Sequence, residues 1–452
     1  MTIAIAKSAA EKALAEAFEA HQAEFAGAAP IQAARKAAIG TFTALGLPHR
    51  RIEAFKYTDV RSAVSSIGAV GSQSGSTSSA DVTGAAIKGY IDRALGAFAD
   101  LDASRIVLID GRLTLDPAGS GLGEGVTLVS LSDALASDTG ELANGRLSMP
   151  ETSADALVAL NTALMQDGVI VRIAPGARLS RPILVVLVRT APEALWTSPR
   201  IVIDVGDAAT ATIIEAYVNI ESAAAGQTNA ATRIVIGDGA VITHVKVATE
   251  LGTVHLGTWS AAIGSDTVYR PFLFNAGPRL TRNQVYVTFD GEGTRLDCSG
   301  VFLARGNEHV DNTLVIDHAV PGCESRELFK GVLDGNARGV FQGKVIVRQI
   351  AQKTDGKQMA QALMLSPTCE FDSKPELEIY ADDVACGHGS TCAEIDPELV
   401  FYLRARGIPE PTARALLMDS FVAEAIEKVE DAPVREALQG LAFRWLHADT
   451  VV

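Results

Sequence analysis

GVIVRIAPGARLSRPILVVLVRT (168–190) opens a long region of short apolar runs that are rich in β-branched residues and separated by turn residues. Runs of the same kind recur as far as KVIVRQI (344–350), and almost no helical periodicity interrupts them. β-Branched residues favour strands because they pack well on a pleated surface. The region therefore predicts a mainly β structure.

Glycine-containing turns punctuate this region at a nearly regular interval. They fall 30, 31, 27 and 27 residues apart, at Gly176, Gly206, Gly237, Gly264 and Gly291. A period in that range is typical of a β-solenoid, in which each coil stacks on the one before and the stack forms one continuous core. On periodicity alone, a β-sandwich or several small β domains remain alternatives.

The segment 1–166 is expected to form a mostly helical domain with a small β element. Apolar residues recur at helical spacing between Ile31 and Leu45, and Gly46 ends that pattern. A further helix is expected near residues 155–166. This domain precedes the solenoid, which we predict over residues 167–395.

Two other features are expected in the N-terminal domain. RIVLIDGRLTL (105–115) predicts two strands that turn at Asp110-Gly111, because both residue types tolerate the left-handed backbone of a tight hairpin. The stretch 71–79 is uncharged and rich in glycine and serine, so a flexible loop is expected there.

Residues 396–452 predict a C-terminal helical domain. Asp396 can cap a helix whose first position is Pro397, and Gly407 ends it. Two more helices follow, each with an apolar stripe on one face, and we expect these stripes to belong mainly to the protein's own core. The stripes are formed by Leu417, Phe421, Ala425 and Val429 and then by Val434, Leu438, Leu441 and Trp445.

Composition restricts the class of partner and the compartment. The net charge of −15 argues against nucleic acid or an anionic membrane as a partner, since those surfaces attract clustered lysine and arginine. There is no apolar run long enough to span a membrane, and acidic residues interrupt the N-terminal region where an export signal needs apolar ones. The five cysteines are an odd number and do not fit a secreted disulfide framework, so a reducing cytoplasm is expected.

Cys386-x-His388-x3-Cys392 is the strongest chemical motif. In an extended chain side chains alternate between faces, so Cys386, His388, Ser390 and Cys392 are expected to share one side. Thiolate and imidazole suit iron, zinc or copper(I). The motif lacks the three or four ligands of a durable metal site, so a cluster here would need ligands from another chain. The simpler alternative is a turn with one buried thiol and a surface histidine.

An ordered set of motifs resembles the SufB/SufD family of iron–sulfur cluster assembly scaffolds, and the SufD branch in particular. The resemblance covers nearly the whole chain, and the N-terminal box and the C-x-H-G form of the late motif favour SufD over SufB. The motifs are GLPHRRIEAFKYTDVR (46–61), NEHVDNTLVIDHAVPGCES (307–325), FKGVLDGNARGVFQGKV (329–345), SPTCEFDSKPELEIYADDVACGHGST (366–391) and FYLRARGI (401–408).

This resemblance implies a right-handed parallel β-helix flanked by an N-terminal α/β domain and C-terminal helices. It also implies a non-ATPase scaffold subunit that pairs with a SufB-like paralogue, binds a SufC-like ATPase, and supports cluster assembly and iron acquisition. The chain alone would hold no cofactor stably, whereas the complex would carry an iron–sulfur cluster or iron transiently and use ATP through SufC. When isolated, the chain could form a homodimer.

The resemblance also points to particular residues. In SufD proteins the histidine of the C-x-H-G motif is implicated in cluster assembly at the junction with SufB. This makes His388 the main candidate, as a metal ligand shared with the partner chain, and Cys386 a weaker one. In the family the helical tail docks SufC, and the matching candidates here are Phe401, Tyr402, Leu403, Arg404, Arg406 and Gly407.

The other cysteines and two matched histidines are expected to be structural. Cys369 and Cys392 replace residues that are usually small or apolar in the family, and both are expected to be incidental buried thiols. Cys298 and Cys323 are expected in the core. Structural hydrogen bonds inside the β-helix are expected for His309 and His318.

Absent motifs and two alternative functions complete the sequence-based picture. GVFQGKV (339–345) lacks the spacing of a phosphate-binding loop and lies in β-rich sequence, so ATP hydrolysis would come from a partner. One alternative is a SufB-type chain that itself carries nascent clusters. The other is a β-helix polysaccharide-degrading enzyme, although only 6% of residues are aromatic; its carboxylates would come from Glu376, Glu378, Asp382 and Asp383.

Overall fold

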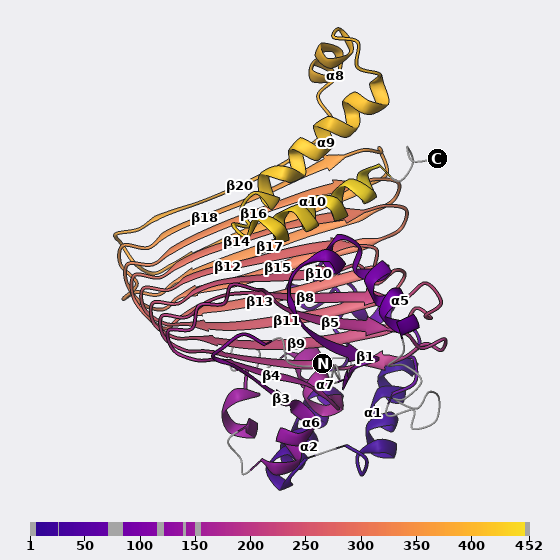
Figure 1. Cartoon of the computed structure of the whole chain (residues 1–452), viewed down its shortest axis with the longest axis vertical. Coiled ribbons are helices and arrows are strands. Elements are labelled where there is room, and N and C mark those ends of the chain that lie inside the picture. Colours follow the sequence, from indigo (N-terminus) through magenta and orange to yellow (C-terminus); the bar gives the residue numbers. More distant parts are fainter. Residues whose placement is uncertain are drawn as a thin grey trace.

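The computed structural model describes residues 6–25, 27–70, 85–114, 122–138, 142–149 and 155–447. Within these ranges two large β-sheets face each other and form a parallel β-solenoid, with helices at both ends (Figure 1). From β4 onward successive strands alternate between the two sheets, apart from the short β6. The structure thus confirms the predicted solenoid. The loop expected at residues 71–79 lies outside the described residues.

The strands of each sheet follow one another in a simple order. The first sheet runs β2 (Arg112–Thr114), β1 (Ser104–Ile109), β5 (Ile183–Arg189), β8 (Thr210–Asn219), β10 (Val241–Ala248), β12 (Val268–Ala276), β14 (Arg295–Ala304), β16 (Glu324–Leu333), β18 (Asp355–Met364) and β20 (Ala385–Ala393). The second runs β19 (Glu370–Ile379), β17 (Arg338–Val347), β15 (His309–His318), β13 (Leu280–Phe289), β11 (Val254–Ile263), β9 (Gln227–Ile236), β7 (Arg200–Val205), β4 (Gly168–Ile173) and β3 (Val126–Ser130), with β6 (Trp196–Thr197) beside β9. Two pairs, β1 with β2 and β3 with β4, are antiparallel.

The recurring glycines lie where one coil stacks on the previous one. The N–H groups of Gly206, Gly237, Gly264 and Gly291 each donate to a carbonyl one coil earlier. A side chain at Gly206 would collide with Pro175, and one at Gly291 would collide with the backbone at residues 264–265. Glycine is therefore required for the close approach of successive turns, which explains the period in the sequence.

Both faces of each sheet are buried along much of their length. The interior cluster contains residues from both sheets, such as Ile213, Trp259 and Phe329. Helices from the two ends of the chain cover the outer faces. As a result, many strands are apolar on both sides and show little alternation in sequence.

Most N-terminal helices pack on the outer face of the second sheet, whereas the segment 85–100 packs on the first. The predicted helices are present as α2 (Ala29–Leu45) and α7 (Ala156–Leu164), and the β1–β2 turn has positive φ at Asp110 and Gly111. Strands β1 and β3 extend the two solenoid sheets, so the N-terminal segment contributes to both. The remaining elements are α1 (Ala9–His21), η1 (Glu53–Phe55), α3 (Val60–Ala63), α5 (Ala85–Leu95), η2 (Gly96–Asp100), α6 (Leu131–Ser137) and η3 (Leu142–Arg146).

Three C-terminal helices follow β20: α8 (Pro397–Arg404), α9 (Glu410–Ile426) and α10 (Ala432–Leu446). As predicted, the Asp396 side chain caps α8, accepting from the N–H of Glu398 at 2.8 Å. Helices α9 and α10 lie on the first sheet, whereas α8 projects away from it (Figure 1). Val422 and Leu438 share a core with strand residues of that sheet, which confirms that the apolar stripes are mainly intramolecular.

Candidate functional site at the open end of the solenoid

The solenoid ends on two edge strands. In the sheet orders above, β19 and β20 are each hydrogen-bonded to a strand on one side only. On β19 the N–H groups of Glu370 and Tyr380 donate toward β17, and on β20 the N–H of Ala385 donates toward β18. Donors alternate sides along a strand, so the N–H of His388 points to the free edge.

The motif side chains continue the interior face of the preceding coil. Gly356 pairs with Cys386 and Gln358 pairs with His388 in the β18–β20 register, and both β18 residues are buried. Cys386, His388, Ser390 and Cys392 therefore share the inward side, as the sequence predicted. No further coil follows β20 in its sheet, so His388 is exposed and Cys386 is half-buried.

Cys386 and Cys392 differ in their environment. Cys386 packs against the interior cluster, and burial raises the pKa of its thiol. Cys392 is exposed, so its predicted burial was wrong. The reason is that an inward-facing position in the last coil has nothing stacked on it. Cys369 is buried, as expected.

The open end carries a partial set of metal ligands. Across the described residues, no three or more His, Cys, Asp or Glu side chains are grouped so that they could hold a metal ion. His388 offers one imidazole and Cys386 one thiol. Such a pair can contribute to a site shared with a second chain but falls short of a durable site by itself.

The structural predictions for the remaining thiols and for His318 are confirmed, whereas His309 forms its hydrogen bond outside the β-helix, with Thr58 of the N-terminal domain. Cys298 and Cys323 are fully buried in the interior cluster. His318 Nε2 lies 3.1 Å from Ser325 Oγ, and His309 Nε2 lies 2.9 Å from Thr58 Oγ1. Burial lowers the pKa of each of these two imidazoles to about 4, so both are neutral at physiological pH.

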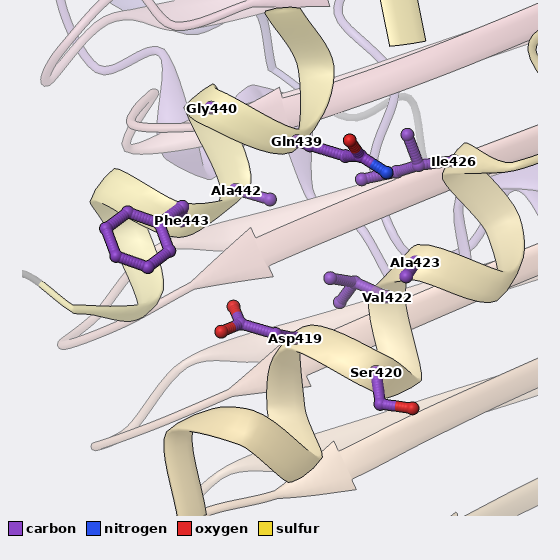
Figure 2. Close-up of a pocket in the computed structure, with 9 residues that line it drawn as sticks. All are labelled: Asp419, Ser420, Val422, Ala423, Ile426, Gln439, Gly440, Ala442 and Phe443. Atoms are coloured by element: carbon purple, nitrogen blue, oxygen red, sulfur yellow. The ribbon is translucent and has the colours of Figure 1, made fainter. Parts of the chain in front are cut away.

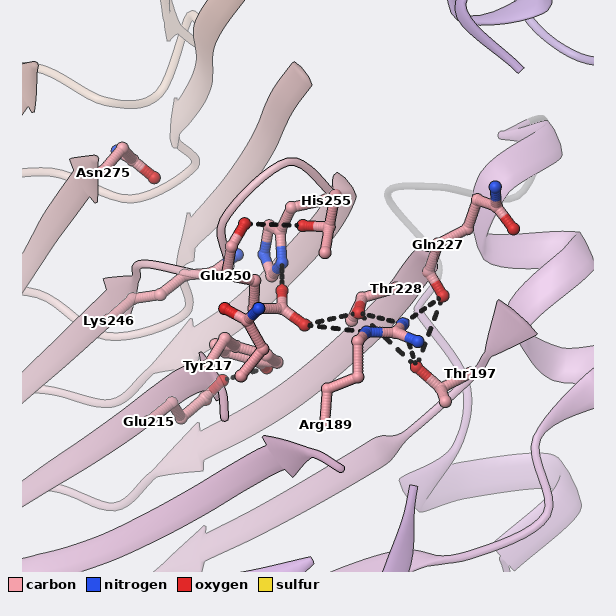
Figure 3. A network of polar contacts seen from close by, with 12 residues as sticks. Arg189, Thr197, Glu215, Tyr217, Gln227, Thr228, Lys246, Glu250, His255 and Asn275 are labelled. Carbon is pink, nitrogen blue, oxygen red and sulfur yellow. Dashed lines mark hydrogen bonds and ion pairs between the residues drawn. The ribbon is translucent and has the colours of Figure 1, made fainter. Parts of the chain in front are cut away.

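The interior also contains a buried polar network that the sequence did not predict (Figure 3). Glu215 accepts hydrogen bonds from the Tyr217 hydroxyl at 2.7 Å and pairs with His244 Nε2 at 2.9 Å. Glu250 pairs with His255 Nδ1 at 2.8 Å and accepts from Thr228. All of these residues are buried, and burial is the main reason that the pKa of His255 is lowered.

Lys246 and Arg189 supply the cations of this network. Lys246 Nζ donates to Asn283 Oδ1 at 2.8 Å, and burial lowers its pKa to about 8. Arg189 Nε lies 3.7 Å from Glu250 Oε1, and its guanidinium also donates to the carbonyl of Gln227. Because both carboxylates are paired and the Lys246 ammonium is hydrogen-bonded, the network is best explained as a structural core.

The partner-binding candidates lie on and just after α8. The side chains of Phe401 and Tyr402 are 72% and 53% exposed, which is unusual for large aromatic groups. Leu403 is half-buried, and Arg404, Arg406 and Gly407 are exposed. The Arg406 guanidinium stacks over the Tyr402 ring, and a shallow hollow beside Phe401 and Tyr402 has a volume of about 520 Å³.

A second hollow lies between α9 and α10, with a volume of about 460 Å³ (Figure 2). Val422, Ile426 and Ala442 give it an apolar floor, and Phe443 lies at its rim. Asp419, which also lines the hollow, pairs with His447 Nε2 at 2.9 Å. Within the described residues, no helix is both long and apolar enough to cross a membrane.

Three of the four carboxylates considered for polysaccharide chemistry are used in surface ion pairs. Glu378 pairs with Lys344 at 2.5 Å, and Glu376 pairs with Lys374 at 3.3 Å. Asp383 pairs with Lys353. These contacts hold adjacent coils or neighbouring residues together and do not converge on a cleft. The strand β17 contains the glycine-rich stretch 339–345, as expected for a stretch that is not a phosphate-binding loop.

Comparison with known proteins identifies the family. The SufBD core domain of the SUF iron–sulfur cluster assembly system matches residues 188–421, and the SufBD N-terminal region matches residues 97–185. An iron–sulfur cluster assembly SufBD family protein of Synechocystis is 30% identical over 90% of this chain and 89% of its own length. SufD of Escherichia coli is 31% identical over 74% of this chain and 78% of its own, and SufD of Bacillus subtilis is 28% identical over 64% and 66%. The chain therefore belongs to the SufB/SufD family of iron–sulfur cluster assembly proteins.

Proposed function

We propose that this chain is a SufD-like scaffold subunit without ATPase activity of its own. It pairs through its open end with a SufB-type chain and docks a SufC-type ATPase through α8. The observation that carries the proposal is the open end, where two free strand edges lie beside an exposed, inward-facing histidine. Family membership and the similarity to SufD of two bacteria support it.

The free edges are suited to pairing with another strand. An unpaired edge presents a row of donors and acceptors that a second chain can complete. On β19 the donors that face outward belong to odd-numbered residues, and one of these positions is Pro375, which has no N–H. Proline at that position limits indiscriminate pairing, so the edge favours a partner that matches the remaining donors.

His388 is suited to bind iron that is being assembled into a cluster. Imidazole binds metal in its neutral form. The iron or cluster is cargo in this scheme and not a resident cofactor. The partner chain supplies the remaining ligands, because the described residues of this chain offer too few.

The exposed aromatic face of α8 is suited to bind the ATPase. Burying Phe401 and Tyr402 in an interface would remove large apolar surfaces from water, and such aromatic residues often dominate binding. The sequence has no phosphate-binding loop, so ATP acts through this partner.

The test uses His388→Ala in the complex purified with its SufB-type and SufC-type partners. We expect the complex and its melting temperature to be nearly unchanged, because the side chain is exposed at the end of the interior. Iron and sulfide content after anaerobic reconstitution should fall several-fold. Cys386→Ala should have a smaller effect, and the matched control Cys392→Ala, on the same strand and exposed, should have almost none.

Two results would contradict the proposal. Full cluster loading in a stable His388→Ala complex would show that the imidazole is not a ligand. Loss of the complex or of folding in this variant would show that His388 is a structural residue.

A further inference from the structure

Glu327 is a buried carboxyl group that the proposed function does not use. It lies on β16, only 3% of it is exposed, and neither carboxylate oxygen has a hydrogen-bond partner. Burial raises its pKa to about 8, against weaker opposing effects of Ser325 and Arg326. An unpartnered carboxyl group in a protein interior costs stability, so its presence requires an explanation.

The strand register places Glu327 directly behind the open end. Cys298 pairs with Glu327, Glu327 with Gln358, and Gln358 with His388, on four successive strands of the first sheet. All four positions are on the inward face. Neighbouring strands are about 4.8 Å apart, so the backbone of Glu327 lies roughly 10 Å from that of His388. The Oε1 atom of Gln358, between them, also lacks a partner.

Among the described residues, the strand neighbours of Glu327 on the inward face include no lysine or arginine. Cys298 lies below it, the half-buried Cys386 lies toward the open end, and His318 is paired with Ser325, two residues before Glu327 on the strand. The second sheet contributes apolar groups to the same interior, including Val345. Arg326, the next residue on the strand, alternates to the outer side and pairs with Asp355 at 2.7 Å.

We propose that Glu327 is a buried counter-charge for a cation held at the open end of the solenoid, neutral while the end is empty and ionised when a divalent cation such as ferrous iron binds beside His388. This inference rests on the proposed role of His388. It explains why a carboxyl group without a partner lies in this column: its partner is the cargo. When the cation binds, Glu327 loses one proton to solvent and its carboxylate offsets one of the two positive charges.

The distance is short enough for this coupling to matter. At an effective dielectric constant near 20, a divalent cation about 10 Å away lowers the pKa of a carboxyl group by about two pH units. A pKa of about 8 would then fall below neutrality. Most of one proton should therefore leave Glu327 for each ion bound at pH 7.5, and cation affinity should depend on pH.

The experiment follows the protonated carboxyl directly in the complex with its partners. Infrared difference spectra are recorded under anaerobic conditions before and after addition of ferrous iron. We expect the C=O band of a protonated carboxyl to disappear when iron binds. The band should be absent in Glu327→Gln, which has nearly the same shape without the charge. The control Glu324→Gln changes an exposed residue of the same strand. It should show the band before iron is added and lose it afterwards, as the wild type does.

Iron affinity provides the second measurement. Glu327→Gln should weaken ferrous iron binding about tenfold or more at pH 7.5 and much less at pH 6, because at pH 6 the cation must compete with the proton on Glu327. A purely structural role would not produce this pH dependence.

The outcomes separate this inference from the proposed function. If iron binds through His388 and the wild-type band does not change, the counter-charge role is wrong and the role of His388 stands. If His388→Ala binds iron as well as the wild type, the proposed ligand is wrong, whatever Glu327 does. The wild-type spectrum alone can overturn the inference. The inference can therefore be tested even if the Glu327→Gln variant does not fold.

Discussion

At the residue scale, the buried Glu327 should make the stability of the protein depend on pH. Burial raises its pKa from the ordinary value of 4.5 to about 8. Between these values the folded state holds one proton more than the unfolded state, so the free energy of unfolding falls as pH rises, by about 1.4 kcal/mol per pH unit. We expect this decline in wild type and not in Glu327→Gln, measured by urea unfolding from pH 5 to 9.

The control for this measurement is Glu324→Gln, which should keep the wild-type pH profile because the side chain is exposed. Equal profiles for wild type and Glu327→Gln would show that Glu327 titrates at its ordinary value and that water reaches it. Other titrating groups add their own pH dependence in both proteins. The deciding quantity is therefore the difference in the free energy of unfolding between the wild type and Glu327→Gln at each pH.

The same residues show what can be predicted at this scale. The shared face of His388 and Cys386 was predictable because the motif is local and side chains alternate along a strand. Glu327, Glu215 and His244 were not predicted. Each occupies an alternate position in a strand, where a polar residue normally faces water, and local sequence does not tell which face of a doubly covered sheet is inward.

At the element scale, β19 offers a test of edge pairing within one strand. Tyr380 donates its N–H to the carbonyl of Val347 of β17. By alternation, the N–H of Glu378 also points toward β17, and the N–H of Ile379 points to the free edge. Ile379→Pro should therefore weaken pairing with the SufB-type chain at least tenfold and leave the melting temperature nearly unchanged. Glu378→Pro should lower the melting temperature because it removes a bond within the sheet.

Calorimetric titration with the partner and thermal unfolding measure the two effects separately. Equal losses of pairing and of thermal stability in Ile379→Pro would indicate that this strand is not a free edge in solution.

The edge position itself could not be derived from sequence, since the alternation of LEIYA is equally compatible with an interior strand covered on one face. The solenoid period, by contrast, was visible in the sequence because close stacking of the turns requires glycine there.

At the scale of the whole molecule, the last two C-terminal helices, α9 and α10, are part of the solenoid's outer layer. Helices α9 and α10 share a core with residues of the first sheet such as Phe272 and Val301. Lys330 of β16 pairs with Glu424 of α9, and the Arg305 guanidinium stacks on the Trp445 ring at 4.0 Å. Helix α8 has only Val400 buried among its residues. The proposed docking surface on α8 and the residues that cover the sheet therefore lie in different parts of residues 396–452.

This division predicts opposite results for two changes in that region. Replacing residues 396–408 with a Gly/Ser linker should abolish binding of the SufC-type ATPase, because it removes Phe401 and Tyr402, and should shift the melting temperature little. Deleting residues 396–452 should destabilise the whole chain, since each large apolar side chain uncovered on the first sheet costs roughly 1.5–3 kcal/mol.

Calorimetry with the ATPase, thermal unfolding and binding of a hydrophobic dye distinguish the two proteins. If the deleted chain melts like the wild type, the helices do not cover the sheet in solution. If the linker chain binds the ATPase with unchanged affinity, the docking surface lies elsewhere, and the hollow between α9 and α10 becomes the candidate to test next.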